Sequence, residues 1–196
     1  MNRRLIAAVV AGLALVTVSC STPNESLAEQ YKNGSEEGYI SGDGSTVEIP
    51  ASNRDEPVSY EAMLDTGETV SSSDFDGSVY VVNFWYSSCP PCRLEAPDLA
   101  ALSIEYPGVP FLGVNVSDTA ETSRTFASDF AVLYASVVDA KTAGVQLAFA
   151  GSVPPNAVPT TLVVDSKGRV AARISGLVRD PSILAAMMDS VIAEDQ

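Results

Sequence analysis

The sequence contains no histidine among its 196 residues. This absence excludes Ser-His-Asp and Cys-His nucleophilic catalysis, zinc and copper sites built on imidazole, and histidine ligation of haem. Cysteine is scarce as well: Cys20, Cys89 and Cys92 are too few for a disulfide-rich scaffold or a four-cysteine zinc site. Basic residues number 11 against 25 acidic ones, a net charge of −14, which argues against nucleic acid or an anionic membrane surface as an electrostatic partner.

The first twenty residues have the pattern of an export signal. Two arginines precede a run of 14 apolar residues from Leu5 to Val18, which is short against the roughly 20 residues that a membrane-spanning helix needs. The run ends in TVSC, which resembles a bacterial lipobox, where cleavage before the cysteine frees it for lipid attachment. We therefore expect residues 1–20 to be a lipoprotein-type signal peptide with Cys20 acylated, or else an uncleaved signal anchor. Either alternative predicts that the rest of the chain lies at the extracytoplasmic face of a bacterial cell membrane.

The segment that follows differs in composition from the rest of the chain. Residues 21–57 are rich in Ser, Gly, Asn and Glu and contain few large apolar residues, which predicts a flexible polar tether. Residues 58–196 are then long enough for one domain with a single well-buried core.

Within that domain, strand and helix patterns alternate. A hairpin is predicted to turn at residues 65–67, and SVYVVNFW, residues 78–85, reads as a buried central strand. Further strands are expected at residues 109–116, 134–138, 160–165 and 169–175, and helices from about residue 91 and at 119–130, 141–150 and 181–193. The last helix is expected to place Ile183, Leu184, Met187, Met188 and Val191 in the core. A strand, a helix and a second strand in this order indicate a parallel crossover.

The chemistry is concentrated in the stretch NFWYSSCPPCRLEAP, residues 83–97. A CxxC pair at the start of a helix lies where unpaired N–H groups and the helix dipole favour thiolate, so Cys89, expected to be the more exposed cysteine, would be the nucleophile. Cys92, one turn further on, could resolve a mixed disulfide. A structural disulfide closing so small a loop removes little chain entropy, and zinc would need two further ligands. Haem attachment would need a histidine where Arg93 stands. A redox pair is therefore the preferred interpretation.

Three segments together resemble the TlpA/ResA-like family of extracytoplasmic thioredoxin-fold proteins. They are VVNFWYSSCPPCRLEAP, the later VPTTLVVDSKGRV and the upstream GETVSSSDFDG, and the similarity extends over about residues 60–193. The resemblance implies an α/β thioredoxin fold, with a central mixed β-sheet flanked by helices and an extra N-terminal β-hairpin. It also implies attack by Cys89, resolution by Cys92, a cis Pro159 packed against the disulfide, and substrate pairing with the backbone of Val158 as an added strand.

The same resemblance indicates residues around the cysteines. Glu95 matches a glutamate that the family commonly has three residues after the second cysteine, where it could tune both thiols; the alternative is a solvated helix carboxylate. Asn83 stands where thioredoxin has a buried aspartate that assists proton transfer, so this task would fall to Glu95 or water. Ser88 replaces the usual tryptophan before the nucleophile, and it is expected to line the substrate surface together with Trp85.

The direction of electron flow is predicted from the residues near the thiols. Pro90 and Pro91 carry no N–H, so two potential donors to the Cys89 thiolate are missing. The acidic surroundings, with Glu95 nearby, also disfavour the thiolate, while Arg93 acts the other way. The balance favours a reductant.

The predicted function is a membrane-tethered thiol-disulfide oxidoreductase that reduces cysteines of exported proteins. By family resemblance, the expected client is apocytochrome c before haem attachment, and the expected electron donor is a membrane protein of the CcdA/DsbD type. No cofactor beyond the Cys89–Cys92 disulfide, no metal and no nucleic-acid partner is expected. Two alternatives stay open: a DsbA-like oxidant of secreted proteins, and, from a different class, a Cu(I) chaperone binding through Cys89 and Cys92.

Overall fold

The structure is a computed structural model that describes residues 44–153 and 157–194. The predicted signal peptide, its Cys20 and the first part of the predicted tether lie outside these residues. Within the described part of the chain, no helix is both long and apolar enough to cross a membrane.

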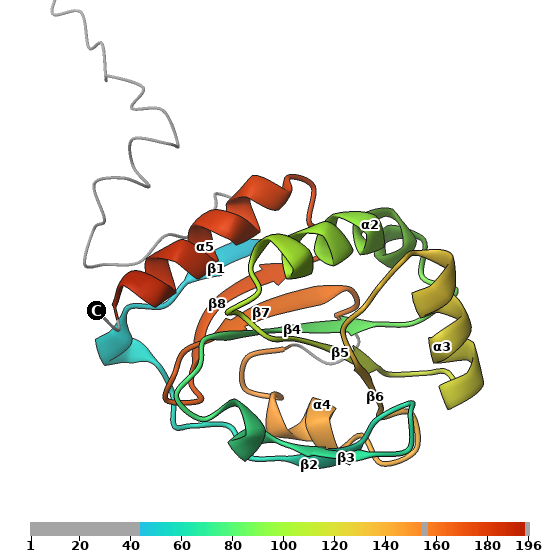
Figure 1. The fold of residues 1–196 in the computed structure, drawn as a ribbon. Helices are drawn as coiled ribbons and strands as arrows, with labels where there is room; N and C mark the ends of the chain where they lie inside the picture. Colours follow the sequence, from blue (N-terminus) through green and yellow to red (C-terminus); the bar gives the residue numbers. More distant parts are fainter. Residues whose placement is uncertain (1–43, 154–156, 195–196) are drawn as a thin grey trace, which may run out of the picture. The chain divides into compact units, whose positions relative to one another are not determined.

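Six strands form one mixed sheet in the order β1-β8-β7-β4-β5-β6 (Figure 1). Its strands are β1 (Thr46–Glu48), β4 (Tyr80–Trp85), β5 (Phe111–Asn115), β6 (Ser136–Val138), β7 (Thr160–Val164) and β8 (Val170–Ser175). Strands β4, β5 and β6 run parallel to one another. Strand β7 pairs antiparallel with β4, β8 pairs antiparallel with β7, and β1 pairs antiparallel with β8. Strand β4 is buried along its whole length, as its β-branched and aromatic residues predict for a central strand.

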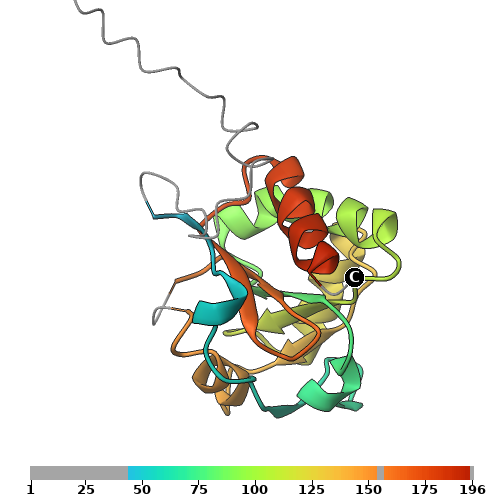
Figure 2. The ribbon, with the colours of Figure 1, turned by 90° about the vertical axis from the view of Figure 1, so that its left-hand side faces the viewer.

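Helices and a hairpin cover the two faces of this sheet. Helices α2 (Pro90–Glu105) and α5 (Pro181–Ala193) lie on one face, and α4 (Gly144–Ala148) lies on the other with the hairpin of β2 (Glu61–Met63) and β3 (Thr69–Ser71) (Figures 1 and 2). Short 3-10 helices follow β1 and β3, at Ala51–Asn53 and Ser72–Phe75. Helix α3 (Ala120–Asp129) joins the α2 face, because its Phe126 packs against Trp85 with ring centroids 4.2 Å apart.

Alternation along β4 creates two cores. Tyr80, Val82 and Phe84 pack into the larger cluster with residues of the hairpin and α4, whereas Trp85 points to a smaller cluster that contains both CxxC cysteines. The sequence prediction of an α/β thioredoxin fold with a central mixed sheet and an extra N-terminal hairpin is confirmed. The predicted hairpin turn is present, and Gly67 adopts there a φ of +95°, which glycine tolerates without strain.

The folded part begins earlier than the predicted tether allows. Strand β1 pairs with β8, with Thr46 opposite Ile174. Arg54, whose side chain is 3% exposed, donates to Asp165 at 3.0 Å and forms an ion pair with Glu194 at 2.7 Å. The predicted boundary at residue 57 is therefore wrong. The segment before it is polar in composition, but it includes strand β1 and the buried Arg54, whose partners lie more than 100 residues away in the sequence.

Smaller differences concern element lengths and one core position. The helix expected at residues 141–150 is only the single turn of α4, and the strand expected at 134–138 begins at Ser136. Ile183 is wrongly placed in the core, since it is 37% exposed, whereas the other four expected core residues of α5 are buried.

Candidate functional site

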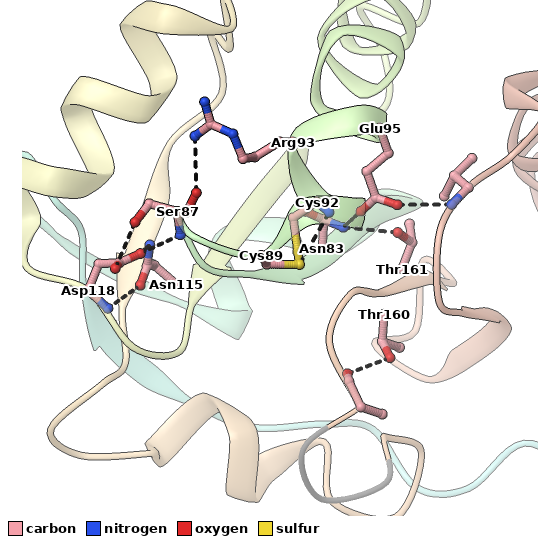
Figure 3. Close-up of a disulfide and its surroundings, with 12 residues drawn as sticks. Asn83, Ser87, Cys89, Cys92, Arg93, Glu95, Asn115, Asp118, Thr160 and Thr161 are labelled. Carbon is pink, nitrogen blue, oxygen red and sulfur yellow. Dashed lines mark hydrogen bonds between the residues drawn. A yellow bond between two sulfur atoms is a disulfide. The ribbon is translucent and has the colours of Figure 1, made fainter.

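The two cysteines of the CxxC motif form a disulfide at the junction of β4 and α2 (Figure 3). Cys89 is the N-cap of α2 and Cys92 lies in its first turn, with their Cα atoms 5.3 Å apart. Pro90 and Pro91 occupy the first two helical positions, where the N–H that proline lacks would have no partner inside the helix. The motif therefore both starts the helix and places a reactive bond at its positive end.

Both sulfur-bearing side chains are buried in this disulfide state. Cys89 is 1% exposed and Cys92 is 2% exposed. The expectation that Cys89 is the more exposed cysteine is thus wrong for the disulfide form, because the sulfurs pack into the cluster of Trp85, Ala96 and Phe126.

The helix supplies one hydrogen-bond donor to the Cys89 sulfur. The backbone N–H of Cys92 donates to Cys89 Sγ at 3.2 Å. The two prolines do remove two donors, but the third helical position, Cys92, retains its N–H and directs it at the sulfur of the N-cap. The end of α2 can therefore still stabilise a thiolate at Cys89.

Glu95 is a buried carboxylate behind the disulfide. It is 1% exposed, and its Oε1 accepts from Asn83 Nδ2 at 3.0 Å while its Oε2 accepts from the N–H of Val178 at 2.9 Å. Burial raises the pKa of Glu95 to about 7, and the two hydrogen bonds only partly oppose that shift. The alternative of a solvated helix carboxylate is therefore wrong, and the group can exchange a proton near neutral pH.

Asn83 connects Glu95 to the surroundings of the disulfide. Its Nδ2 also donates to Thr161 Oγ1 at 3.0 Å, so this amide joins α2, β4 and β7 (Figure 3). Asn83 and Cys92 line the same small hollow between α2 and α3. No described arginine or lysine pairs with Glu95. Its charge is thus held by neutral donors alone.

The loop before β7 contains the cis proline that the family resemblance implies. The Val158–Pro159 peptide bond is cis, and Val158 packs against the cluster that contains the disulfide. The C=O of Pro159 accepts from the N–H of Gly176 at 2.8 Å. Among the described residues, none forms a hydrogen bond with the backbone of Val158. Pairing of a substrate strand with Val158 stays a prediction, and this backbone is open to it.

Trp85 and Ser88 are both expected at the substrate surface, but only Ser88 is accessible. Ser88 is exposed immediately before Cys89. Trp85 is 4% exposed and its ring packs at a tilt against Phe126, so it supports the cysteines from inside the domain. Its assignment to the substrate surface is therefore wrong, because the side chain of β4 at this position faces the core.

The sequence reasoning missed a polar cluster that holds the loop before Cys89. Asp118 accepts from the N–H and the Oγ of Ser87 at 2.6 and 2.9 Å, and from Asn115 Nδ2 at 2.8 Å. Asn115 Oδ1 in turn accepts from the N–H groups of Ser117 and Asp118. A turn formed by Asn and Asp after a strand is readable from sequence, but its contact with a residue 31 positions away is not.

Arg93 reaches the same loop from the other side. Its Nη1 donates to the C=O of Ser87 at 3.2 Å, and its guanidinium lies 4.9 Å from the centre of the Phe130 ring. The positive charge of Arg93, near the cysteines, is therefore already bound by the C=O of Ser87 and the ring of Phe130. Across residues 44–153 and 157–194, no three cysteine or acidic side chains gather closely enough to hold a metal ion.

Comparison with known proteins gives a consistent group of relatives. A model of the AhpC/TSA family matches residues 54–173. The chain is 32% identical over 120 residues to the thiol:disulfide interchange protein HelX of Rhodobacter capsulatus, covering 60% of this chain and 63% of that protein. It is 33% identical over 113 residues to the thiol-disulfide oxidoreductase ResA of Geobacillus kaustophilus, covering 57% and 62%. The chain therefore spans slightly less than two thirds of these curated relatives, and their names confirm the resemblance to TlpA/ResA-like proteins.

Solved structures share the fold over nearly their whole length. A DsbF homologue from Corynebacterium diphtheriae superposes with a TM-score of 0.68 at 27% identity, covering 78% of this chain and 96% of that one. A secreted thiol-disulfide isomerase from Corynebacterium glutamicum gives a TM-score of 0.68 at 28% identity, covering 79% and 99%.

Proposed function

We propose that this chain, which belongs to the AhpC/TSA family of thioredoxin-fold proteins, is a protein thiol-disulfide oxidoreductase. The observation that carries the proposal is the Cys89–Cys92 disulfide at the N-terminus of α2, with the buried carboxyl group of Glu95 on the same helix. A disulfide that merely braces the fold needs neither a helix N-terminus directed at one sulfur nor a proton-exchanging group behind the other. Both features suit thiol-disulfide exchange.

The exchange follows from these groups. In the reduced protein, the Cys89 thiolate attacks one sulfur of a client disulfide, forming a mixed disulfide and releasing the other client sulfur as a thiolate that takes up a proton. Cys92 then loses its proton and attacks Cys89 Sγ, which releases the second client thiol and leaves the protein disulfide. In this proposal Glu95, with a pKa of about 7, accepts the Cys92 proton, and the hydrogen bond from Asn83 orients its carboxylate.

The proposed direction is reduction of client disulfides. The carboxylate of Glu95 and the formal charge of −14 disfavour an additional thiolate, and among the residues that the structure describes only the N–H of Cys92 donates to Cys89 Sγ. A weakly stabilised thiolate makes the dithiol a better electron donor. The competing candidate, a DsbA-like oxidant, is favoured by that same N–H contact at a helix N-terminus.

The setting and partners are proposed from the N-terminal sequence and the family resemblance. The domain would act outside the cytoplasm, held at a bacterial membrane by lipid on Cys20 or by a signal anchor. Its clients would be exported proteins with cysteine pairs, apocytochrome c first among them. Electrons would come from a membrane-embedded dithiol protein of the CcdA/DsbD type.

The redox potential tests the direction. The protein is equilibrated with glutathione or dithiothreitol buffers at pH 7, and the fraction of disulfide is measured by alkylation and mass spectrometry. We expect a potential near the roughly −270 mV of thioredoxin, whereas a value near the roughly −120 mV of DsbA would favour the oxidant. A Cu(I) titration of the reduced protein would test the chaperone alternative.

A further inference from the structure

The loop that presents Cys89 is held by hydrogen bonds as well as by the packing of Tyr86 against the cluster around the disulfide. It comprises Tyr86, Ser87 and Ser88, of which Ser88 is exposed and the other two are half-buried. Apart from the turn in which the N–H of Cys89 donates to the C=O of Tyr86 at 3.2 Å, its hydrogen bonds converge on Ser87. The position of Cys89 therefore depends on what holds Ser87.

Asp118 accepts two of the three hydrogen bonds that fix Ser87. Its carboxylate binds both the N–H and the hydroxyl of Ser87, and Asn115 fixes the carboxylate from behind (Figure 3). The two loops meet because β4 and β5 are neighbouring parallel strands, whose carboxyl ends lie at the same edge of the sheet. Arg93 adds a hydrogen bond to the C=O of Ser87. We call these three hydrogen bonds, two with Asp118 and one with Arg93, the clamp on Ser87.

We infer that Asp118 is a positioning residue for the Cys89–Cys92 exchange and that it biases the pair towards donating electrons. This inference rests on the proposed exchange function and adds to it the residue that sets its direction.

The first reason is the effective concentration of the two thiols. When the disulfide is reduced, the two sulfurs are no longer bonded to each other, and the Cys89 side chain is kept beside Cys92 by its place at the N-cap of α2 and by the loop before it. A loop clamped at Ser87 keeps the two sulfurs close, which favours re-formation of the intramolecular disulfide. A pair that closes its own disulfide readily is a stronger reductant.

The second reason is charge, and it has the same sign. The carboxylate of Asp118 hydrogen-bonds to a residue only two positions before Cys89. A negative charge nearby disfavours a thiolate there, which destabilises the reduced state relative to the disulfide. Position and charge therefore both make the dithiol more strongly reducing.

The test compares variants of the full chain in their equilibrium with glutathione. In this reaction the protein disulfide and two glutathione thiols yield the protein dithiol and one glutathione disulfide, so atoms, protons and electrons balance. For Asp118→Ala and Asp118→Asn we expect the equilibrium to shift about tenfold towards the dithiol, equivalent to about 30 mV. In the same variants, the thiolate absorbance of Cys89 near 240 nm should develop at lower pH, which a purely structural role would not cause.

Two further variants separate the contributions. Ser87→Ala removes one hydrogen bond of the clamp without changing charge, and we expect a shift of about threefold, in line with loss of one modest hydrogen bond. Asp98→Asn makes the same charge change on α2, where the side chain has no hydrogen bond, and we expect it to stay within twofold of wild type. Ser87→Ala also keeps the inference testable if the Asp118 variants fail to fold.

The outcomes distinguish this inference from the function on which it rests. Wild-type protein that exchanges with glutathione, together with folded Asp118 and Ser87 variants that match it within twofold, would overturn the role of Asp118 alone. Wild-type protein that does not exchange at all would overturn the proposed function and the inference together.

Discussion

Replacing Glu95 with glutamine should change how stability depends on pH. In the unfolded chain, this carboxyl group has a pKa near 4.5, and burial raises it to about 7 in the folded protein. The folded state therefore holds the proton more tightly than the unfolded state does. Below pH 4.5 the group is protonated in both states and contributes no pH-dependent difference; as pH rises, ionisation favours unfolding, and the full penalty is present above pH 7.

The size of this effect follows from the shift. A difference of about 2.5 pKa units at 1.36 kcal/mol per unit gives about 3 kcal/mol of destabilisation between pH 4 and pH 8.5. Glutamine carries no charge at either pH, although it can keep only one of the two acceptor contacts, with Asn83 or Val178. The variant should therefore be less stable than wild type at pH 4 and gain about 3 kcal/mol relative to it by pH 8.5.

The assay is urea unfolding of the disulfide form of both proteins at pH values from 4 to 8.5. Other groups titrate in this range, so the informative quantity is the difference between the two unfolding free energies at each pH. Glu105→Gln is the matched control, because it makes the same chemical change at an exposed position of α2. If the profiles of wild type and Glu95→Gln stay parallel within about 0.5 kcal/mol over the whole range, the argument from burial is wrong.

Three further predictions concern other parts of the domain. Arg54→Ala should lower the unfolding free energy by about 3 kcal/mol in urea, because it leaves the carboxylate of Asp165 buried with one ion-pair partner fewer; a loss below 0.5 kcal/mol would show that the ion pair contributes little. Gly113→Ala should cost about 2 kcal/mol by the same measurement, since a β carbon there would clash with Ser136 Oγ and press on Trp85 Nε1, and a variant as stable as wild type would contradict that contact. Cys92→Ser should accumulate mixed disulfides with clients through Cys89, detectable by non-reducing electrophoresis; a variant that traps none, or traps them through another residue, would reverse the assigned roles.

Features with a local signature could be predicted from the sequence. The hairpin turn at Gly67, the central strand β4 and the helix α5 each follow from residue types within one short window, and all three are present. The CxxC motif at the start of a helix is equally local, since Cys89 and the prolines define the N-terminus of α2. The cis Pro159 followed only from the family resemblance, because no local pattern distinguishes it from a trans proline.

Features that depend on distant partners could not be predicted. Arg54 looked like part of a polar linker because its partners, Asp165 and Glu194, come more than 100 residues later. The sequence left Glu95 equally compatible with solvent and burial, and only the packing of α2 on the loop at Val178 decides between them. The contact between Asp118 and the loop before Cys89 likewise exists only once β4 and β5 lie side by side.

The pairing of β1 with β8 also determines at which end of the sheet the described chain begins. The C=O of Ser45 accepts from Ser175 at the end of β8, and the next residue, Gly176, bonds to Pro159. At the other limit of the described chain, Glu194 binds Arg54 beside Asp165, at the opposite end of β7. A label or surface attached at the start of the described chain would therefore lie at the end of the sheet that carries Pro159, whereas one attached at residue 194 would lie at the opposite end of the sheet.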